Sequence, residues 1–79
     1  MNNNENKTSS ETQNAKIRAW LEDGKKISPL LALKLFGCFR LASRIWDLRE
    51  RGMNIGDEWV IDDKGKRHKE YYWIDYEQE

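Results

Sequence analysis

Residues 28–52 read SPLLALKLFGCFRLASRIWDLRERG, and the first part of this stretch predicts a short helix. Ser28 can cap the helix, and Pro29 suits the first turn because the N–H that proline lacks has no intrahelical partner there. Apolar residues fill most of the following positions up to Gly37, which ends the pattern. A helix that is apolar on most sides is usually buried. We therefore expect this helix to lie centrally in the fold.

A second helix is expected from residue 39 or 40 to residue 51, with Gly52 closing it. Leu41, Ile45 and Leu48 recur at helical spacing and would form its inward stripe. Two short helices that are joined by a brief glycine-containing turn are typical of a helix-turn-helix. The opposite face of the second helix would carry Arg40, Ser43, Arg44 and Asp47.

Another helix is expected upstream, over residues 11–23. Ser10 and Gln13 have the spacing of a capping box at its start, and Gly24 is a typical stop signal at its end. Residues 25–27 form a short connector, which we expect to be extended and to make at most one β-bridge.

Downstream of the helices, two runs rich in β-branched and aromatic residues predict a hairpin with strands over 58–61 and 71–74. The connecting residues 62–65, Asp-Asp-Lys-Gly, suit a type I turn with glycine at positive φ, but a two-residue turn at 64–65 would also fit. The two registers differ by one residue and bury opposite faces of the hairpin. The inward pair is either Tyr71 and Trp73, which we favour because they are larger, or Tyr72 and Ile74.

The predicted elements follow the order helix, short strand, helix, turn, helix, hairpin. This is the order of a winged helix-turn-helix, a mainly α fold in which a three-helix core carries a small antiparallel β-hairpin, the wing. The tip of the wing would span residues 62–67. The domain would cover residues 11–75, between a disordered polar tail at 1–10 and an acidic end at 76–79.

Composition excludes several classes of protein. The chain has 79 residues, of which 38% are hydrophobic, so it has room for one small domain. One cysteine and one histidine leave no intramolecular disulfide and no ordinary zinc site, and no catalytic set is visible. We expect no cofactor, no metal and no enzymatic activity, and we expect Cys38 to be a buried structural thiol. No apolar run approaches the ~20 residues that span a bilayer, and no signal pattern is visible, which favours a cytoplasmic protein.

Acidic and basic residues are segregated along the chain, although 14 of each give a net charge of zero. Residues 24–52 contain seven basic and two acidic residues, and residues 64–69 add four bases and no acid. The last ten residues contain four acids and no base. The neutral net charge argues weakly against nucleic-acid binding, whereas the basic helix-turn-helix and hairpin tip favour it.

Residues 28–52 also resemble a family of short bacterial, phage and prophage helix-turn-helix domains. The family core reads roughly Pro-x-x-Ala-Leu-x-x-Phe-Gly-Cys-x-Arg-Leu-small-small-Arg-Ile-x-Asp-Leu-Arg-x-x-Gly, and nearly every position matches in this sequence. The resemblance covers about residues 14–73, and it implies a winged helix-turn-helix fold and a DNA-binding role. The sequence departs from the family where members often place a more apolar or purely basic run, at His68, Lys69 and Glu70.

The expected partner is double-stranded DNA. An α-helix fits the major groove, where outward side chains near its N-terminus reach base edges and an arginine can bind guanine through two hydrogen bonds. Basic side chains at a hairpin tip can follow the phosphate backbone. The predicted DNA-binding residues are Phe39, Arg40, Ser43, Arg44 and Asp47 in the recognition helix, and Lys64, Lys66 and Arg67 in the wing.

Alternative interpretations stay open at this point. Arg44 and Asp47 are three positions apart and can pair on the helix surface, and basic hairpin tips also occur as ordinary solvated turns. Trp46 could pack under the wing, stack on a sugar or join a dimer. The protein would act in transcription, replication or excision as a phage-type or mobile-element regulator, or alternatively as a protein-protein interaction module, because fold does not imply function. A homodimer or a protein partner is a further alternative, because a single recognition helix binds DNA weakly.

Overall fold

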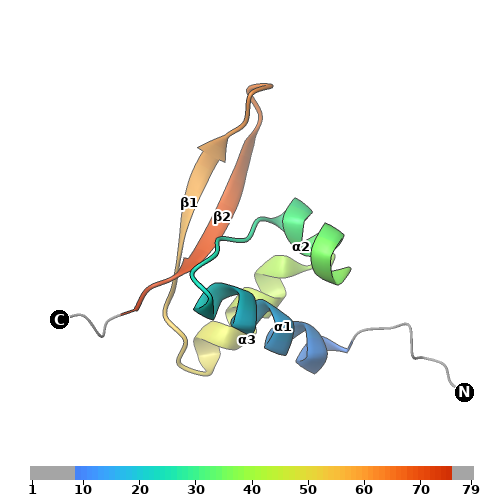
Figure 1. Ribbon diagram of the computed structural model, residues 1–79, viewed down its shortest axis with the longest axis vertical. Coiled ribbons are helices and arrows are strands. Elements are labelled where there is room, and N and C mark those ends of the chain that lie inside the picture. The colour runs from blue at the N-terminus through green and yellow to red at the C-terminus, as the bar shows by residue number, and fades with distance from the viewer. Residues whose placement is uncertain (1–8, 76–79) are drawn as a thin grey trace, which may run out of the picture.

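Three helices and a β-hairpin make up the computed structural model, which describes residues 9–75 (Figure 1). The hairpin projects well beyond the helices. This architecture confirms the predicted fold class. Apart from Ser9 and Ser10, the predicted N-terminal tail and the acidic end at 76–79 lie outside the described residues. The elements are α1 (Ser10–Glu22), α2 (Pro29–Phe36), α3 (Leu41–Glu50), β1 (Ile55–Ile61) and β2 (Arg67–Trp73).

The start of α1 differs from the prediction. Ser9 is the capping residue, with φ −68° and ψ 164°, and its hydroxyl accepts a hydrogen bond from the Thr12 N–H at 3.1 Å. Ser10 is already helical, so the predicted capping box of Ser10 and Gln13 is wrong. The Gln13 side chain instead donates to the carbonyl oxygen of Gly37 at 3.4 Å. This contact with the turn after α2 draws Gln13 away from the end of its own helix.

Both ends of α2 lie where the sequence predicts them. The Ser28 hydroxyl accepts a hydrogen bond from the Leu31 N–H at 3.2 Å. At the other end Gly37 has a φ of +63°, a left-handed conformation that glycine adopts without steric cost.

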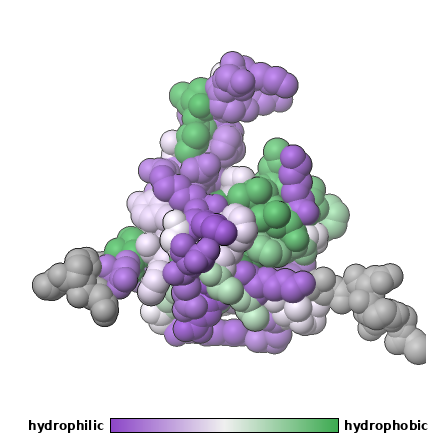
Figure 2. All heavy atoms as spheres, in the orientation of Figure 1, coloured by the Kyte–Doolittle hydropathy of each residue, from purple (hydrophilic) through white to green (hydrophobic). Residues whose placement is uncertain are grey.

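The predicted central position of α2 is wrong. Ala32 is its one buried residue, and Leu30, Leu33 and Leu35 are exposed. Figure 2 shows the resulting apolar surface over α2. A helix of eight residues buries one stripe against its neighbours, and no other element of the described chain covers its remaining sides.

Most of the core comes from α1 and α3. Ile17 and Leu21 of α1 pack with Ile45 and Leu48 of α3, and all four side chains are fully buried. Burying a side chain of this size contributes about 1.5–3 kcal/mol. The predicted inward stripe of α3 and the predicted burial of Cys38 are both confirmed. α3 is therefore held against α1 by buried apolar side chains.

The two hairpin strands are longer than predicted. β1 and β2 pair antiparallel without interruption from Ile55 opposite Trp73 to Ile61 opposite Arg67. Arg67 thus lies in β2 and not in the wing tip, which is a correction to the predicted tip of 62–67. β1 gains residues 55–57 at the core end, where Ile55 is buried. The residues that β2 gains, 67–70, are polar because this part of the hairpin extends beyond the core. The sequence there lacks the apolar alternation that marks a half-buried strand.

The turn of the hairpin confirms the first of the two predicted connections. The Gly65 N–H donates to the carbonyl oxygen of Asp62 at 3.0 Å, and Gly65 has a φ of +83°. In the resulting register Tyr71 lies in the core and Trp73 packs against it, as favoured from the sequence.

A single β-bridge connects the helices to the hairpin. The Ile27 N–H donates to the Tyr71 carbonyl oxygen at 3.0 Å, and the Tyr71 N–H donates to the Ile27 carbonyl oxygen at 2.8 Å. This confirms the one-bridge strand that was expected before α2. Because both residues are buried, the bridge fixes the start of the helix-turn-helix against β2.

Candidate nucleic-acid interface

The turn before α3 presents two exposed side chains. Phe39 is 83% exposed, and Arg40, the residue that precedes the first helical turn, makes no side-chain capping bond. Within residues 9–75, no carboxylate forms an ion pair with Arg40. Both residues were predicted from the sequence to contact DNA, and both are accessible to a partner.

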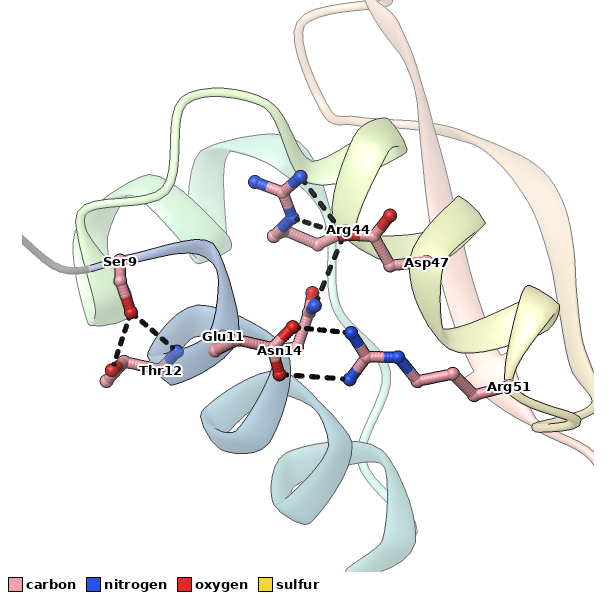
Figure 3. A network of polar contacts seen from close by, with 7 residues as sticks. All are labelled: Ser9, Glu11, Thr12, Asn14, Arg44, Asp47 and Arg51. Carbon is pink, nitrogen blue, oxygen red and sulfur yellow. Dashed lines mark hydrogen bonds and ion pairs between the residues drawn. The ribbon is translucent and has the colours of Figure 1, made fainter.

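Arg44 and Asp47 turn toward α1. The Asp47 Oδ2 atom accepts hydrogen bonds from Arg44 Nε at 3.2 Å and from Asn14 Nδ2 at 3.2 Å, and it lies 3.1 Å from Arg44 Nη2 (Figure 3). The Arg44 side chain is only 16% exposed. Their expected place on the outward face of α3 is therefore wrong, and the surface-pair alternative describes their geometry better.

Asn14 explains why the pair lies inward. This residue of α1 is 1% exposed, so its amide needs partners within the protein. The Asp47 carboxylate accepts a hydrogen bond from this amide. The bond joins α1 and α3 beside their apolar packing. The sequence contained no signal for this contact, because Asn14 and Asp47 are 33 positions apart.

The outward face of α3 is more apolar than predicted. Ala42 and Trp46 are exposed there, and Trp46 is 61% exposed. Ser43 is half-buried at the edge of this face. Trp46 therefore does not pack under the wing, which was one of the three alternatives for it.

Arg49 joins the end of α3 to the hairpin. Its Nε and Nη2 atoms donate to the Ile55 carbonyl oxygen at 3.0 and 2.7 Å, and Nη2 also donates to Asp57 Oδ2 at 3.1 Å. These contacts occupy the outward-facing carbonyl at the start of β1. Arg49 therefore connects the end of α3 to β1.

Arg51 joins the same end of α3 to the start of α1. Its Nη1 atom lies 3.2 Å from Glu11 Oε1, and its Nη2 atom donates to the second carboxylate oxygen in a bidentate pair (Figure 3). Hydrogen bonding and charge attraction from Arg51 hold the pKa of Glu11 below its ordinary value of 4.5.

The Glu11–Arg51 pair predicts a stability difference that depends on pH. Because folding lowers the pKa of Glu11, the ionised carboxylate stabilises the fold above pH 4.5, and this contribution is lost as the pH falls through the lowered pKa. Wild type should melt at a slightly higher temperature than Glu11→Gln at pH 7, and the two melting curves should converge in acid. Thermal melts monitored by circular dichroism measure this, and a gap that persists at the acid end would contradict it.

The wing tip exposes the side chains of Lys64 and Lys66. The Asp62 Oδ1 atom accepts hydrogen bonds from the main-chain N–H groups of both lysines, each at 2.9 Å, which keeps the turn tight. Neither ammonium group pairs with a carboxylate of residues 9–75. Arg67 follows at the start of β2, with its guanidinium 4.7 Å from the centre of the Trp59 ring.

A family model described as a winged helix-turn-helix domain matches residues 12–73. The chain belongs to this family. No curated protein and no solved structure matches the winged helix-turn-helix chain with significance. Membership of the family suggests DNA binding.

In the structure of this winged helix-turn-helix domain, the predicted site residues lie in three groups. Phe39, Arg40 and Ser43 lie at the head of α3, and Arg44 and Asp47 are turned inward. The third group is in the hairpin, where Lys66 and Arg67 line a hollow of about 440 Å³ together with the start of α2. The residues that complete this hollow are Ser28, Pro29, Leu30, Asp62 and His68.

Two further features are absent from residues 9–75 of the winged helix-turn-helix domain. That part of the chain contains no group of three or more histidine, cysteine, aspartate or glutamate residues that could hold a metal ion. None of its helices is long and apolar enough to cross a bilayer.

Proposed function

We propose that this winged helix-turn-helix domain binds double-stranded DNA, with the head of α3 in the major groove and the wing on the phosphate backbone. One observation carries the proposal. Seven of the 13 lysines and arginines in residues 9–75 form ion pairs with carboxylates, whereas the four predicted bases at the head of α3 and in the wing, like Lys16 and Lys34 elsewhere, form none there. Charges without an internal partner can neutralise phosphates. These four bases are Arg40, Lys64, Lys66 and Arg67.

Each residue at the head of α3 has a distinct part in the proposal. Arg40 binds a guanine edge or a phosphate, and Phe39 makes apolar contact with a thymine methyl group. Ser43 is short enough to let the helix approach the groove. Arg44 and Asp47 act as positioning residues, since their pair with Asn14 sets the orientation of the helix that carries Arg40.

We further propose that the DNA bound belongs to a phage-type or mobile-element setting, in transcription, replication or excision. The support is the close match of residues 28–52 to the motif of phage and prophage domains. The exposed recognition-helix turn fits each of these processes equally well.

The wing lysines provide the test of backbone binding. The double variant Lys64→Ala/Lys66→Ala should bind labelled duplex more weakly, with a shallower salt dependence, because each lost phosphate contact lowers the slope by about 0.9. Between about 50 and 200 mM salt, the affinity advantage of wild type over the double variant should shrink about tenfold. Fluorescence anisotropy with a random-sequence duplex measures both quantities.

Lys16→Ala provides the matched control. Lys16 lies on α1, is exposed and forms no ion pair within residues 9–75, so its replacement removes one unpaired charge away from the proposed interface. It should bind as wild type does. If wild type fails to bind any duplex at low salt, the DNA-binding function is wrong.

A protein-interaction module is the second candidate function, and the apolar surface favours it. Leu30, Phe39 and Trp46 are each more than 60% exposed, and exposed apolar surface often marks a protein interface. This function predicts self-association or partner binding that is lost in Trp46→Ala. Sedimentation that shows a concentration-dependent dimer, together with no duplex binding, would favour the second function over the first.

A further inference from the structure

The two faces of the hairpin differ in charge. Since β1 and β2 pair in one unbroken register, odd-numbered residues of both strands lie on one face and even-numbered residues on the other. The odd face begins with the core residues Ile55 and Tyr71 and continues outward past the core. Its outer part, the aromatic face, consists of Asp57, Trp59, Ile61, Arg67 and Lys69, whereas the opposite, acidic face carries Glu58, His68, Glu70 and Tyr72.

Trp59 organises the aromatic face. Its ring is flanked by two cations of the neighbouring strand, with the Arg67 guanidinium 4.7 Å and the Lys69 ammonium 5.0 Å from the ring centre. The residue is 58% exposed, so this arrangement faces solvent. Cations within about 6 Å of an indole face are attracted by its quadrupole. The ring therefore holds two long, otherwise flexible side chains along the wing.

A single acid, Asp57, lies among the cations of the aromatic face. Its Oδ2 atom accepts a hydrogen bond from Arg49 of α3 at 3.1 Å, and its Oδ1 atom forms an ion pair with Lys69 at 4.0 Å. This one carboxylate is shared by two cations, and Arg67 has no carboxylate partner within residues 9–75, so positive charge is in excess on this face. The Arg49 contact also shows that the aromatic face and α3 lie on the same side of the molecule.

Building on the proposed DNA-binding function, we propose that the aromatic face is the side of the wing that binds the sugar–phosphate backbone of DNA. Arg67 and Lys69 contact phosphates, and Trp59 is a positioning residue that holds both cations ready. This extends the interface from the wing tip down the face of the hairpin. It also assigns the acidic face to solvent, because Glu58 and Glu70 would repel phosphate.

Lys26 provides a matched control on the acidic face. Its ammonium lies 5.8 Å from the centre of the Tyr72 ring, so it also packs on an aromatic side chain. Its Nζ atom is 2.7 Å from Glu58 Oε2. Lys26→Ala thus removes one cation from a similar setting on the opposite side of the wing.

The test compares duplex affinity by anisotropy at about 50 and 200 mM salt. Arg67→Ala/Lys69→Ala should weaken binding, and the advantage of wild type should shrink about tenfold over this range, because two phosphate contacts are lost. Trp59→Leu should weaken binding about two- to tenfold with an unchanged salt slope, because the cations remain but must be ordered on binding. Trp59→Phe should regain part of the loss, and Lys26→Ala should match wild type.

Folding and contact are checked independently. Circular dichroism melts show whether each variant folds. The indole N–H signal of Trp59 in the NMR spectrum, identified by its absence in Trp59→Phe, should shift when duplex is added to wild type.

Three outcomes would overturn the inference or the function beneath it. If wild type binds duplex and the wing-tip variant is impaired, but Arg67→Ala/Lys69→Ala behaves like Lys26→Ala, the aromatic face is not the contact surface. A Trp59→Leu variant with wild-type affinity would overturn the positioning role. If wild type binds no duplex, the proposed function fails, and this inference fails with it.

Discussion

Replacing Asp47 with alanine is expected to lower the free energy of unfolding by about 2–4 kcal/mol. The Asp47 carboxylate accepts hydrogen bonds from both Arg44 and Asn14. Without it, an arginine side chain that is 16% exposed and an asparagine that is 1% exposed lose their shared acceptor. The cost of withdrawing those donors from water is then uncompensated. Urea denaturation that is followed by circular dichroism measures the change.

A double variant separates charge pairing from simple loss of packing. Arg44→Met/Asp47→Leu removes both charges and fills similar volume, so it should recover the part of the loss that comes from the unpaired Arg44, while Asn14 still lacks its acceptor. The double variant retains the Arg40 side chain, so a loss of affinity for duplex would support the positioning role of the Arg44–Asp47 pair. Unchanged stability in Asp47→Ala would show that the contact between α1 and α3 does not depend on this carboxylate.

Arg40→Ala is expected to weaken binding to a preferred DNA sequence by about 1–3 kcal/mol, or roughly 5- to 150-fold. The reason is the loss of a guanidinium that the structure leaves exposed at the head of α3, where a bidentate contact with guanine can form. The preferred sequence is first selected from a random duplex library. Anisotropy with the selected and a scrambled duplex then gives the two affinities.

Arg40→Lys is the matched control for charge. Lysine keeps the positive charge but not the planar fork, so affinity for scrambled duplex should persist while the preference for the selected sequence falls. If Arg40→Ala loses the same factor on both duplexes, Arg40 contacts the backbone only. If it loses nothing on either, the head of α3 is not at the interface.

Local signals in the sequence predicted the parts of the fold that depend on a few neighbouring residues. The Ser28 cap, the Gly37 stop and the turn at Asp62–Gly65 are each fixed by backbone geometry within one turn, so they could be located without tertiary information. The sequence could not show which of Ser9 and Ser10 caps α1, because both serines can cap a helix equally well. Gln13, which would have completed a capping box with Ser10, bonds instead to Gly37, 24 positions away.

The burial of α2 and the direction of the Arg44 side chain depend on tertiary packing, and the sequence did not predict them. The apolar composition of α2 predicted a central helix, but burial depends on how many neighbours surround a helix, and α2 has too few to cover Leu30 and Leu35. In the candidate site, the outward placement of Arg40 was predictable from its position before α3. The inward placement of Arg44 depends on Asn14, a buried polar residue of another helix.

The doubly bonded Asp62 carboxylate limits how the wing tip can recognise an anion. Because it already occupies the N–H groups of Lys64 and Lys66, the tip has only flexible ammonium groups to offer there. Ammonium groups respond to charge density and not to the tetrahedral geometry of a phosphate. A sulfated polysaccharide such as heparin would therefore compete with DNA for the wing tip. Acetylation of the two lysines would remove their charges and abolish anion binding there.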